Sequence, residues 1–440
     1  MNVPLDNLYN WVEGLLPEPA TLYIFYPHGS KEIFNFRKLR KTSDFDMCSS
    51  PGVIMHDQEP LNWNAYNSSQ DHRKNWESEL TEVCEIDLKK IKMQYFSNFN
   101  LKSYALYNSN LFDSAILVHS EKNSEDLEKY KQNDFFCVHY WAHAVIARDW
   151  YRFAEIDSRL VRAIGKTNNK FLIYCRDWSH GREYRLKFLE MLVQNNLDTV
   201  SQTSVMHTNS EGMNFLQYQF SNPKLELTNP ELISQIPNNT FASAASADYN
   251  YYDFINSAIS VVLETVFDDQ RIHLTEKTLR PIACSHPFIL AAGPGSLEYI
   301  RNYGFQTFAP WIDESYDLEI DSVKRLEKII LAMNKIQNLQ GDELYIFSQN
   351  IKKIAEFNKK HFFSDEFFDL VKDELKTNLI SAYNLVKKTQ GKHYLKILAT
   401  AKKNNLKHQL QDRTKRTLLL RQLRQSCPRD PSNPQEDPSV

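Results

Sequence analysis

Short apolar runs alternate with longer amphipathic stretches along most of this chain, which is the pattern of an α/β protein. A break near residues 152–167 divides the apolar runs into two groups. Strands that alternate with helices favour parallel sheets covered by helices on both faces. The predicted strands are Thr21–Tyr26, Gly52–Asp57, Ser114–Ser120, Asp134–Trp141, Lys170–Arg176, Ser204–Thr208, Ala258–Thr265 and Pro287–Gly293.

Helical segments separate these strands, and three long helices are expected between about residues 322 and 389. The fold class is therefore α/β, with two Rossmann-like domains and a helical C-terminal extension. The predicted domains are residues 1–165, 166–320 and 321–390, followed by a basic helix and a Pro-rich tail in 391–440. The basic helix is either a solvated tail or a segment that attaches to an anionic membrane surface.

Composition and charge leave the predicted fold unchanged, but they indicate which partners and which cellular compartment to expect. The net charge of −3 over 440 residues gives no general attraction to nucleic acid. The six cysteines are scattered without a CxxC pair, which is typical of reduced cysteines in a cytosolic protein. The first residues lack the pattern of a signal peptide, and no apolar stretch approaches the ~20 residues of a membrane span. We therefore expect a cytoplasmic protein.

The segment Val261–Ser296 carries the richest set of polar residues, in the order strand, helix, strand, turn. Ligands of open α/β sheets bind at the carboxyl ends of strands, and helix N-termini favour anions. Any one of these residues alone fits a first turn or a core histidine, but together they favour a nucleotide-sugar site. The candidate donor-binding residues here are Glu264, Thr275, Glu276, Lys277, His286, Pro287, Gly295 and Ser296.

Two other segments follow predicted strands and carry candidate groups. In His56–Pro60, the HDQEP loop, Asp57 and Glu59 are candidates for a general base toward an acceptor hydroxyl, although the loop also reads as a capped turn. Arg176 and Arg182 are candidates for binding a carboxylate or phosphate, because guanidinium matches both groups bidentately. Arg148 is a similar candidate, and each arginine alone also fits a structural ion pair.

The residues Glu264, Leu274–Lys277 and Pro287–Ile289 resemble the donor-binding block of α1,3-fucosyltransferases. A wider pattern is more similar to the retaining β-Kdo transferases of O-antigen synthesis, and it covers most of Leu22–Asp317. That pattern consists of Met55–Trp63, His139–Glu155, Tyr174–Leu186 and the His286-Pro287 pair.

This resemblance implies a retaining glycosyltransferase of modified GT-B fold that uses CMP-Kdo without a metal and acts on O-antigen or capsule. The acceptor would bind to the first half and the donor to the second, where His286 would contact the nucleotide and phosphate. Retention implies a covalent carboxylate adduct, for which Asp248 is preferred and Asp253 is the competitor. Alternatives are a GDP-sugar-dependent, fucosyltransferase-like enzyme and a non-catalytic glycan-binding module. The basic helix would allow peripheral contact with the inner face of the cytoplasmic membrane.

Overall fold

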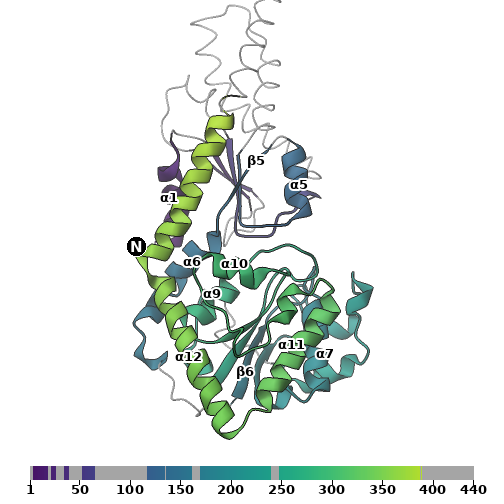
Figure 1. Ribbon diagram of the computed structural model, residues 1–440. Coiled ribbons are helices and arrows are strands. Elements are labelled where there is room, and N and C mark those ends of the chain that lie inside the picture. The colour runs from purple at the N-terminus through teal and green to yellow at the C-terminus, as the bar shows by residue number, and fades with distance from the viewer. Residues whose placement is uncertain are drawn as a thin grey trace, which may run out of the picture.

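The computed structural model describes residues 3–17, 21–25, 34–38, 52–64, 116–133, 135–160, 169–238, 247–386 and 388. Within these ranges the chain forms two sheets, which follow one another in sequence and lie apart in space (Figure 1). The strand order is β2-β1-β3-β4-β5 in the N-terminal sheet and β7-β6-β8-β9 in the C-terminal sheet. The protein is thus mixed α/β with two largely parallel sheets, as the alternation of strands and helices predicts, and this architecture is compatible with two Rossmann-like domains.

The N-terminal sheet is parallel from β1 to β5, and β2 pairs antiparallel with β1 at one edge. Its inner strand β4 is buried at every position, which explains the apolar run Ile116–Val118 before His119. The strands are β1 (Thr21–Phe25), β2 (Phe34–Lys38), β3 (Gly52–His56), β4 (Ile116–His119) and β5 (Phe136–His139). The helices described in this half are α1 (Leu8–Leu15), α5 (Glu125–Gln132) and α6 (Ala142–Trp150).

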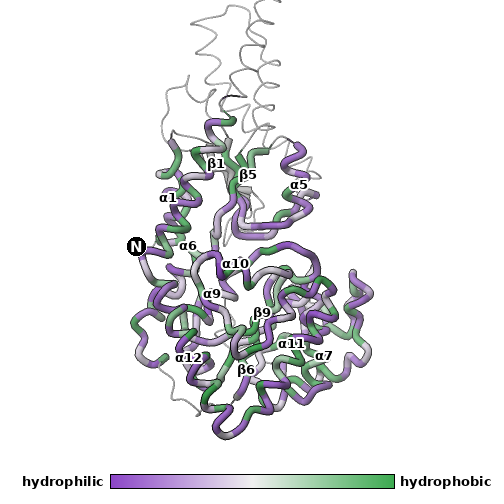
Figure 2. Tube along the Cα trace, in the orientation of Figure 1, coloured by the Kyte–Doolittle hydropathy of each residue, from purple (hydrophilic) through white to green (hydrophobic). Residues whose placement is uncertain are grey.

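The C-terminal sheet is parallel throughout. It consists of β6 (Asn169–Cys175), β7 (Ser201–Val205), β8 (Ser257–Leu263) and β9 (Phe288–Ala291). Hydrophobic residues concentrate along β6 and β9 in Figure 2, because a sheet with helices on both faces has little contact with water. The apolar runs that predict these strands in the sequence are therefore the centre of the core.

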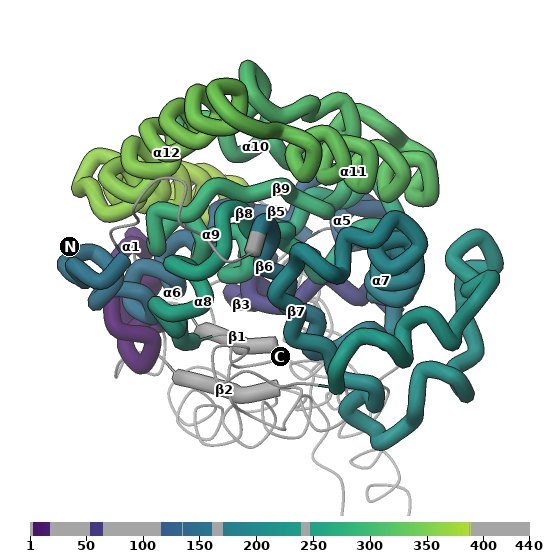
Figure 3. The backbone as a smooth tube through the Cα atoms, turned by 90° about the horizontal axis from the view of Figure 1, so that it is seen from below, coloured from purple at the N-terminus to yellow at the C-terminus, as the bar shows by residue number. Residues whose placement is uncertain are grey.

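Helices cover the C-terminal sheet on two sides, as Figure 3 shows. On one face lie α8 (Tyr251–Asn256), α9 (Glu276–Ala283) and α12 (Gly341–Phe363), and on the other lie α7 (Tyr184–Gln194) and α11 (Ser322–Gln337). The short α10 (Ser296–Asn302) follows β9. The long helices expected as an extension thus form part of the C-terminal half, where α11 buries residues such as Ile329 and Met333.

The chain then returns to the N-terminal half. Residues 365–386 are helical and pack along α1, where the rings of Trp11 and Phe368 lie 5.9 Å apart (Figure 1). At the turn between α12 and this helix, the Arg148 guanidinium donates to the main-chain oxygens of Phe362, Phe363 and Ser364. Arg148 therefore caps the C-terminus of α12. Its guanidinium is held by the main chain and is not the free group for binding a carboxylate or phosphate that the sequence suggests.

Every predicted strand within the described ranges is found, with ends that differ by a few residues. Among the described strands and α-helices, the edge strand β2 and the helices α1 and α8 were not predicted from the sequence. The helix expected over residues 75–96 and the basic segment 391–440 lie outside the described residues. In the part of the chain that is described, no helix is both long and apolar enough to cross a membrane.

Candidate functional site

The order of the C-terminal strands creates a topological switch point between β6 and β8. The connection through α7 leads from β6 outward to β7, and the connection through α9 leads from β8 outward to β9 on the other side. α7 and α9 cover opposite faces of the sheet, so the direction of the strand order reverses between β6 and β8 (Figure 3). Ligands of open α/β sheets bind at such a point.

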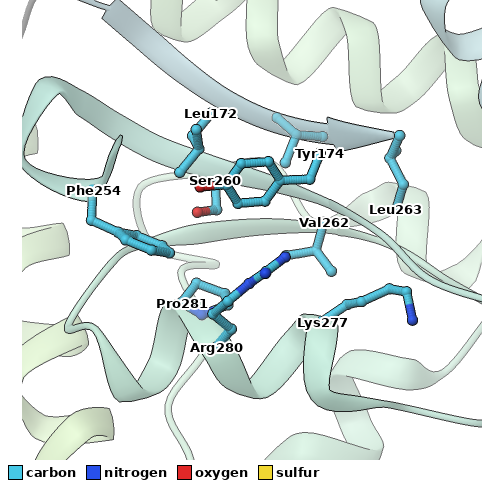
Figure 4. Close-up of a pocket in the computed structure, with 10 residues that line it drawn as sticks. Leu172, Tyr174, Phe254, Ser260, Val262, Leu263, Lys277, Arg280 and Pro281 are labelled. Atoms are coloured by element: carbon cyan, nitrogen blue, oxygen red, sulfur yellow. The ribbon is translucent and has the colours of Figure 1, made fainter. Parts of the chain in front are cut away.

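A narrow pocket of about 30 Å³ lies between β6, β8 and α9 (Figure 4). Its polar groups are Tyr174 from β6, Ser260 from β8, and Lys277 and Arg280 from α9. The Arg280 guanidinium lies 4.5 Å from the centre of the Tyr174 ring. Of the candidate residues predicted from the sequence, all of which fall in the described ranges, Lys277 alone lines this pocket. Arg280 was not predicted, although its spacing of three from Lys277 places both on one helix face.

The start of α9 is held by a buried carboxylate from within the protein. Glu264, at the end of β8, is fully buried and accepts the main-chain N–H groups of Thr275 at 3.0 Å and Thr278 at 3.2 Å. It also accepts the hydroxyls of Thr275 at 2.7 Å and Thr278 at 2.6 Å. The sequence predicts that N–H groups at this helix start bind a phosphate, but those of Thr275 and Thr278 already donate to Glu264.

The same arrangement recurs at α10. Gly295 precedes this helix with a φ of 83°, a conformation that suits glycine, and Ser296 donates to the Gly293 main-chain oxygen at 2.6 Å. The carboxylate of Asp317 accepts the N–H of Leu297 at 3.1 Å. The turn at Gly295 and Ser296 is thus closed by the protein's own acid instead of being open to a ligand.

His286 and Asp253 are both buried with their polar atoms engaged. The His286 ring contacts the Ser260 hydroxyl at 2.8 Å and the Ser257 main-chain oxygen at 3.0 Å, near the amino ends of β8 and β9. Pro287 follows it and accepts the Ser260 N–H at 2.8 Å. The two carboxylate oxygens of Asp253 accept hydrogen bonds from Tyr174 at 2.8 Å and Gln202 at 2.6 Å. Both residues join elements of the core and lie outside the pocket lining.

Asp248 has a different setting. Its side chain is exposed, and its main-chain oxygen accepts a hydrogen bond of 3.4 Å from the Arg280 guanidinium. Because Arg280 lines the pocket, this contact places Asp248 at the pocket's rim. Of the two candidate nucleophiles, Asp248 is the one whose carboxylate remains accessible.

The arginines after β6 lie beside the pocket instead of in it. Arg176 is exposed, whereas Arg182 donates to the Asp177 carboxylate at 2.9 Å. Burial lowers the pKa of Arg182, and the neighbouring charge of Arg185 lowers it further, while Asp177 and Glu59 act in the opposite direction. Glu59 comes from the HDQEP loop, so its charge reaches Arg182 from the other half of the protein.

The HDQEP loop is largely buried. Asp57 is 1% exposed and accepts a short hydrogen bond from the Tyr140 hydroxyl, and Gln58 donates to the Tyr9 hydroxyl at 2.6 Å. Burial raises the pKa of Asp57 to about 6, against the opposing effects of Tyr140 and His143. A carboxylate whose pKa lies close to neutrality suits a general base. Glu59, by contrast, is exposed.

The segment 271–276, which leads into α9, is bonded to both halves of the protein. Main-chain hydrogen bonds of 3.0 Å join Ile272 and Lys122 in both directions, and the Trp141 indole donates to the Leu274 oxygen at 2.9 Å. On the C-terminal side, a Cβ atom added at Gly293 would lie 2.0 Å from the Arg271 main-chain oxygen. Only glycine allows this approach.

Gly293→Ala is therefore expected to destabilise the protein by about 2–3 kcal/mol, because the segment must move away from β9. Urea unfolding measures this change. Gly14→Ala is the control, since the space around Gly14 in α1 is open and alanine favours a helix. Equal stability of Gly293→Ala and the wild-type protein would contradict the close approach.

Among the residues that the structure describes, no group of three or more His, Cys, Asp or Glu side chains is placed to hold a metal ion. The candidate site thus consists of the pocket cations Lys277 and Arg280 and the acid Asp248 beside them. The segment 271–276 connects this site to the N-terminal half, which carries the HDQEP loop.

Neither a scan against protein-family models nor a search of curated proteins finds a match to this chain.

Proposed function

We propose that this protein is a glycosyltransferase of the GT-B type, in which the anionic groups of a donor nucleotide-sugar contact Lys277 and Arg280 beside the narrow pocket between β6, β8 and α9. The observation that carries the proposal is the pair of cations, Lys277 and Arg280, at the switch point of the sheet. Cationic side chains stabilise a leaving phosphate without a metal. The proposed donor is CMP-Kdo, which has two anionic groups, a phosphate and a sugar carboxylate, to match two cations.

The accessible carboxylate at the pocket rim supports a retaining mechanism. In this proposal Asp248 attacks the anomeric carbon, the bond to the phosphate oxygen breaks, and CMP leaves as a monoester. The acceptor hydroxyl then gives its proton to Asp57 or Glu59 and displaces Asp248, which restores the configuration. Asp253 has no part in this scheme, because both of its oxygens are hydrogen-bonded.

The acceptor would be a surface polysaccharide such as O-antigen or capsule, approaching from the side of the HDQEP loop. Synthesis of such polymers would place the protein in the cytoplasm, with the basic C-terminal segment touching the inner face of the membrane.

Mass spectrometry of the intact protein tests the proposal, with CMP-Kdo and GDP-fucose offered separately. We expect the mass of one Kdo to be added with CMP-Kdo in the wild-type protein and in Asp253→Asn, but not in Asp248→Ala. Turnover of GDP-fucose alone would move the assignment to a fucosyltransferase-like enzyme. Glycan binding without turnover of either donor would instead favour a non-catalytic module.

A further inference from the structure

An aromatic ring and a cation face each other across the narrow pocket. Tyr174 and Leu172 lie on one face of β6, because alternate residues of a strand point to the same side, and both line the pocket (Figure 4). On the opposite wall, Arg280 follows Lys277 by three positions and shares its face of α9. The Arg280 guanidinium lies 4.5 Å from the centre of the Tyr174 ring. This separation is within the range of a cation–π contact.

A buried carboxylate fixes the orientation of the Tyr174 ring. Asp253 is 3% exposed and accepts hydrogen bonds from the Tyr174 hydroxyl at 2.8 Å and from the Gln202 side-chain amide at 2.6 Å. The three side chains come from α8, β6 and β7. Rotation of the ring away from the pocket would take the hydroxyl from this buried acceptor, which is costly. The ring is therefore a rigid wall of the pocket.

The Arg280 guanidinium has little contact with water. Arg280 is 5% exposed, and its Nη1 atom donates to the Asp248 main-chain oxygen at 3.4 Å. An aromatic face attracts a cation more strongly when the two are shielded from water. The Tyr174 ring thus holds a shielded guanidinium beside both the pocket and the candidate nucleophile.

We infer that Tyr174 is a positioning residue for Arg280. The inference rests on the proposed function, in which Arg280 contacts an anionic group of the donor. A guanidinium that is already held in place by the ring needs little reorganisation when the anion arrives. The same side chain binds the main chain of Asp248, so the ring also helps to set the distance between the donor's anion and the acid that attacks the sugar.

Modification of arginines by phenylglyoxal, followed by peptide mass spectrometry, tests the contact without any ligand. Tyr174→Leu removes the ring, whereas Tyr174→Phe keeps the ring and loses only the hydrogen bond to Asp253. We expect Arg280 to react about fivefold faster in Tyr174→Leu than in the wild-type protein, and within about twofold of wild type in Tyr174→Phe. Equal reactivity of Arg280 in folded Tyr174→Leu and in the wild-type protein would overturn the inference. Tyr174→Met, which fills more of the space of the ring, gives the same test if Tyr174→Leu does not fold.

Two controls stand beside this measurement. Arg301 lies on α10, outside the pocket lining, and should react at one rate in all variants. Tyr218→Leu is the matched variant, because the Tyr218 hydroxyl also donates to a buried carboxylate, that of Glu183 at 3.0 Å, but its ring packs against Trp178. This variant should leave the reactivity of Arg280 unchanged.

Calorimetry with CMP separates this inference from the proposed function. If both hold, Tyr174→Leu binds CMP about fivefold more weakly than the wild-type protein and Tyr174→Phe do. If the wild-type protein binds no CMP while Arg280 still responds to Tyr174→Leu, the proposed donor is wrong and the role of the ring in holding Arg280 stands. If the wild-type protein and Tyr174→Leu bind CMP equally well, Tyr174 does not position Arg280 for the donor, and the proposed donor stands.

Discussion

Replacement of Glu264 by alanine is expected to lower the free energy of unfolding by about 4 kcal/mol. The fully buried carboxylate accepts from two threonine hydroxyls and from the main-chain N–H groups of Thr265, Thr275 and Thr278. Alanine leaves these buried donors without an acceptor and opens a cavity at the start of α9. Urea unfolding followed by circular dichroism measures the loss.

Glu211→Ala is the matched control, because Glu211 is exposed and pairs with His180 at 3.0 Å on the surface. Such a pair contributes less than about 1 kcal/mol, so this variant should unfold close to the wild-type protein. A Glu264→Ala protein within about 1 kcal/mol of wild type would show that the carboxylate does not hold α9 as described. It would then have to be considered as a group that binds a ligand.

Asp57→Asn is expected to stabilise the protein at pH 8 and, if Asp57 is the general base of the proposed reaction, to lower the rate of sugar transfer by about 100-fold or more. Burial raises the pKa of Asp57 from 3.8 to about 6, so the folded protein binds this proton more tightly than the unfolded chain does. The corresponding stability is present in full below about pH 4 and is lost as the pH rises through about 6. Above that range the buried charge costs about 3 kcal/mol.

Asparagine has no charge to bury and can still accept the hydrogen bond from the Tyr140 hydroxyl. The free energy of unfolding of Asp57→Asn should therefore exceed that of the wild-type protein by an amount that grows from pH 4 to pH 8. Chemical unfolding at several pH values, with the difference from wild type taken at each, isolates this group from other buried acids such as Glu121. Glu59→Gln is the comparison for activity, since Glu59 is exposed and should not change stability. If Glu59→Gln loses sugar transfer while Asp57→Asn keeps full activity, the general base is Glu59 and not Asp57.

The strands could be predicted from the sequence because a strand buried on both faces is an uninterrupted apolar run. The run Ala258–Thr265 thus predicts β8, which spans Ser257–Leu263. The edge strand β2 has the sequence FNFRK, in which polar residues interrupt the apolar ones. Helix α8, YYDFIN, consists mostly of poor helix formers, and its start depends on the Asn250 side chain, which accepts the Tyr252 N–H at 3.1 Å.

The candidate site could be predicted only where one segment carries all of its residues. Lys277 follows from the junction of a strand and a helix, but Tyr174 and Arg280 meet only because α9 packs over β6 and β8. Contacts between distant elements are not encoded in local spacing.

Glu264 and Asp317, which accept N–H groups at the starts of α9 and α10, affect how the ligand specificity of this protein can change during evolution. Where a ligand's anion sits on main-chain N–H groups, its recognition is tied to the backbone and hence to the fold. Here Glu264 and Asp317 already neutralise both helix starts. In the proposed site, recognition of the donor's anionic groups would be left to side chains such as Lys277 and Arg280, which single codon changes can replace. New ligand specificities are therefore open to this scaffold without loss of its helices.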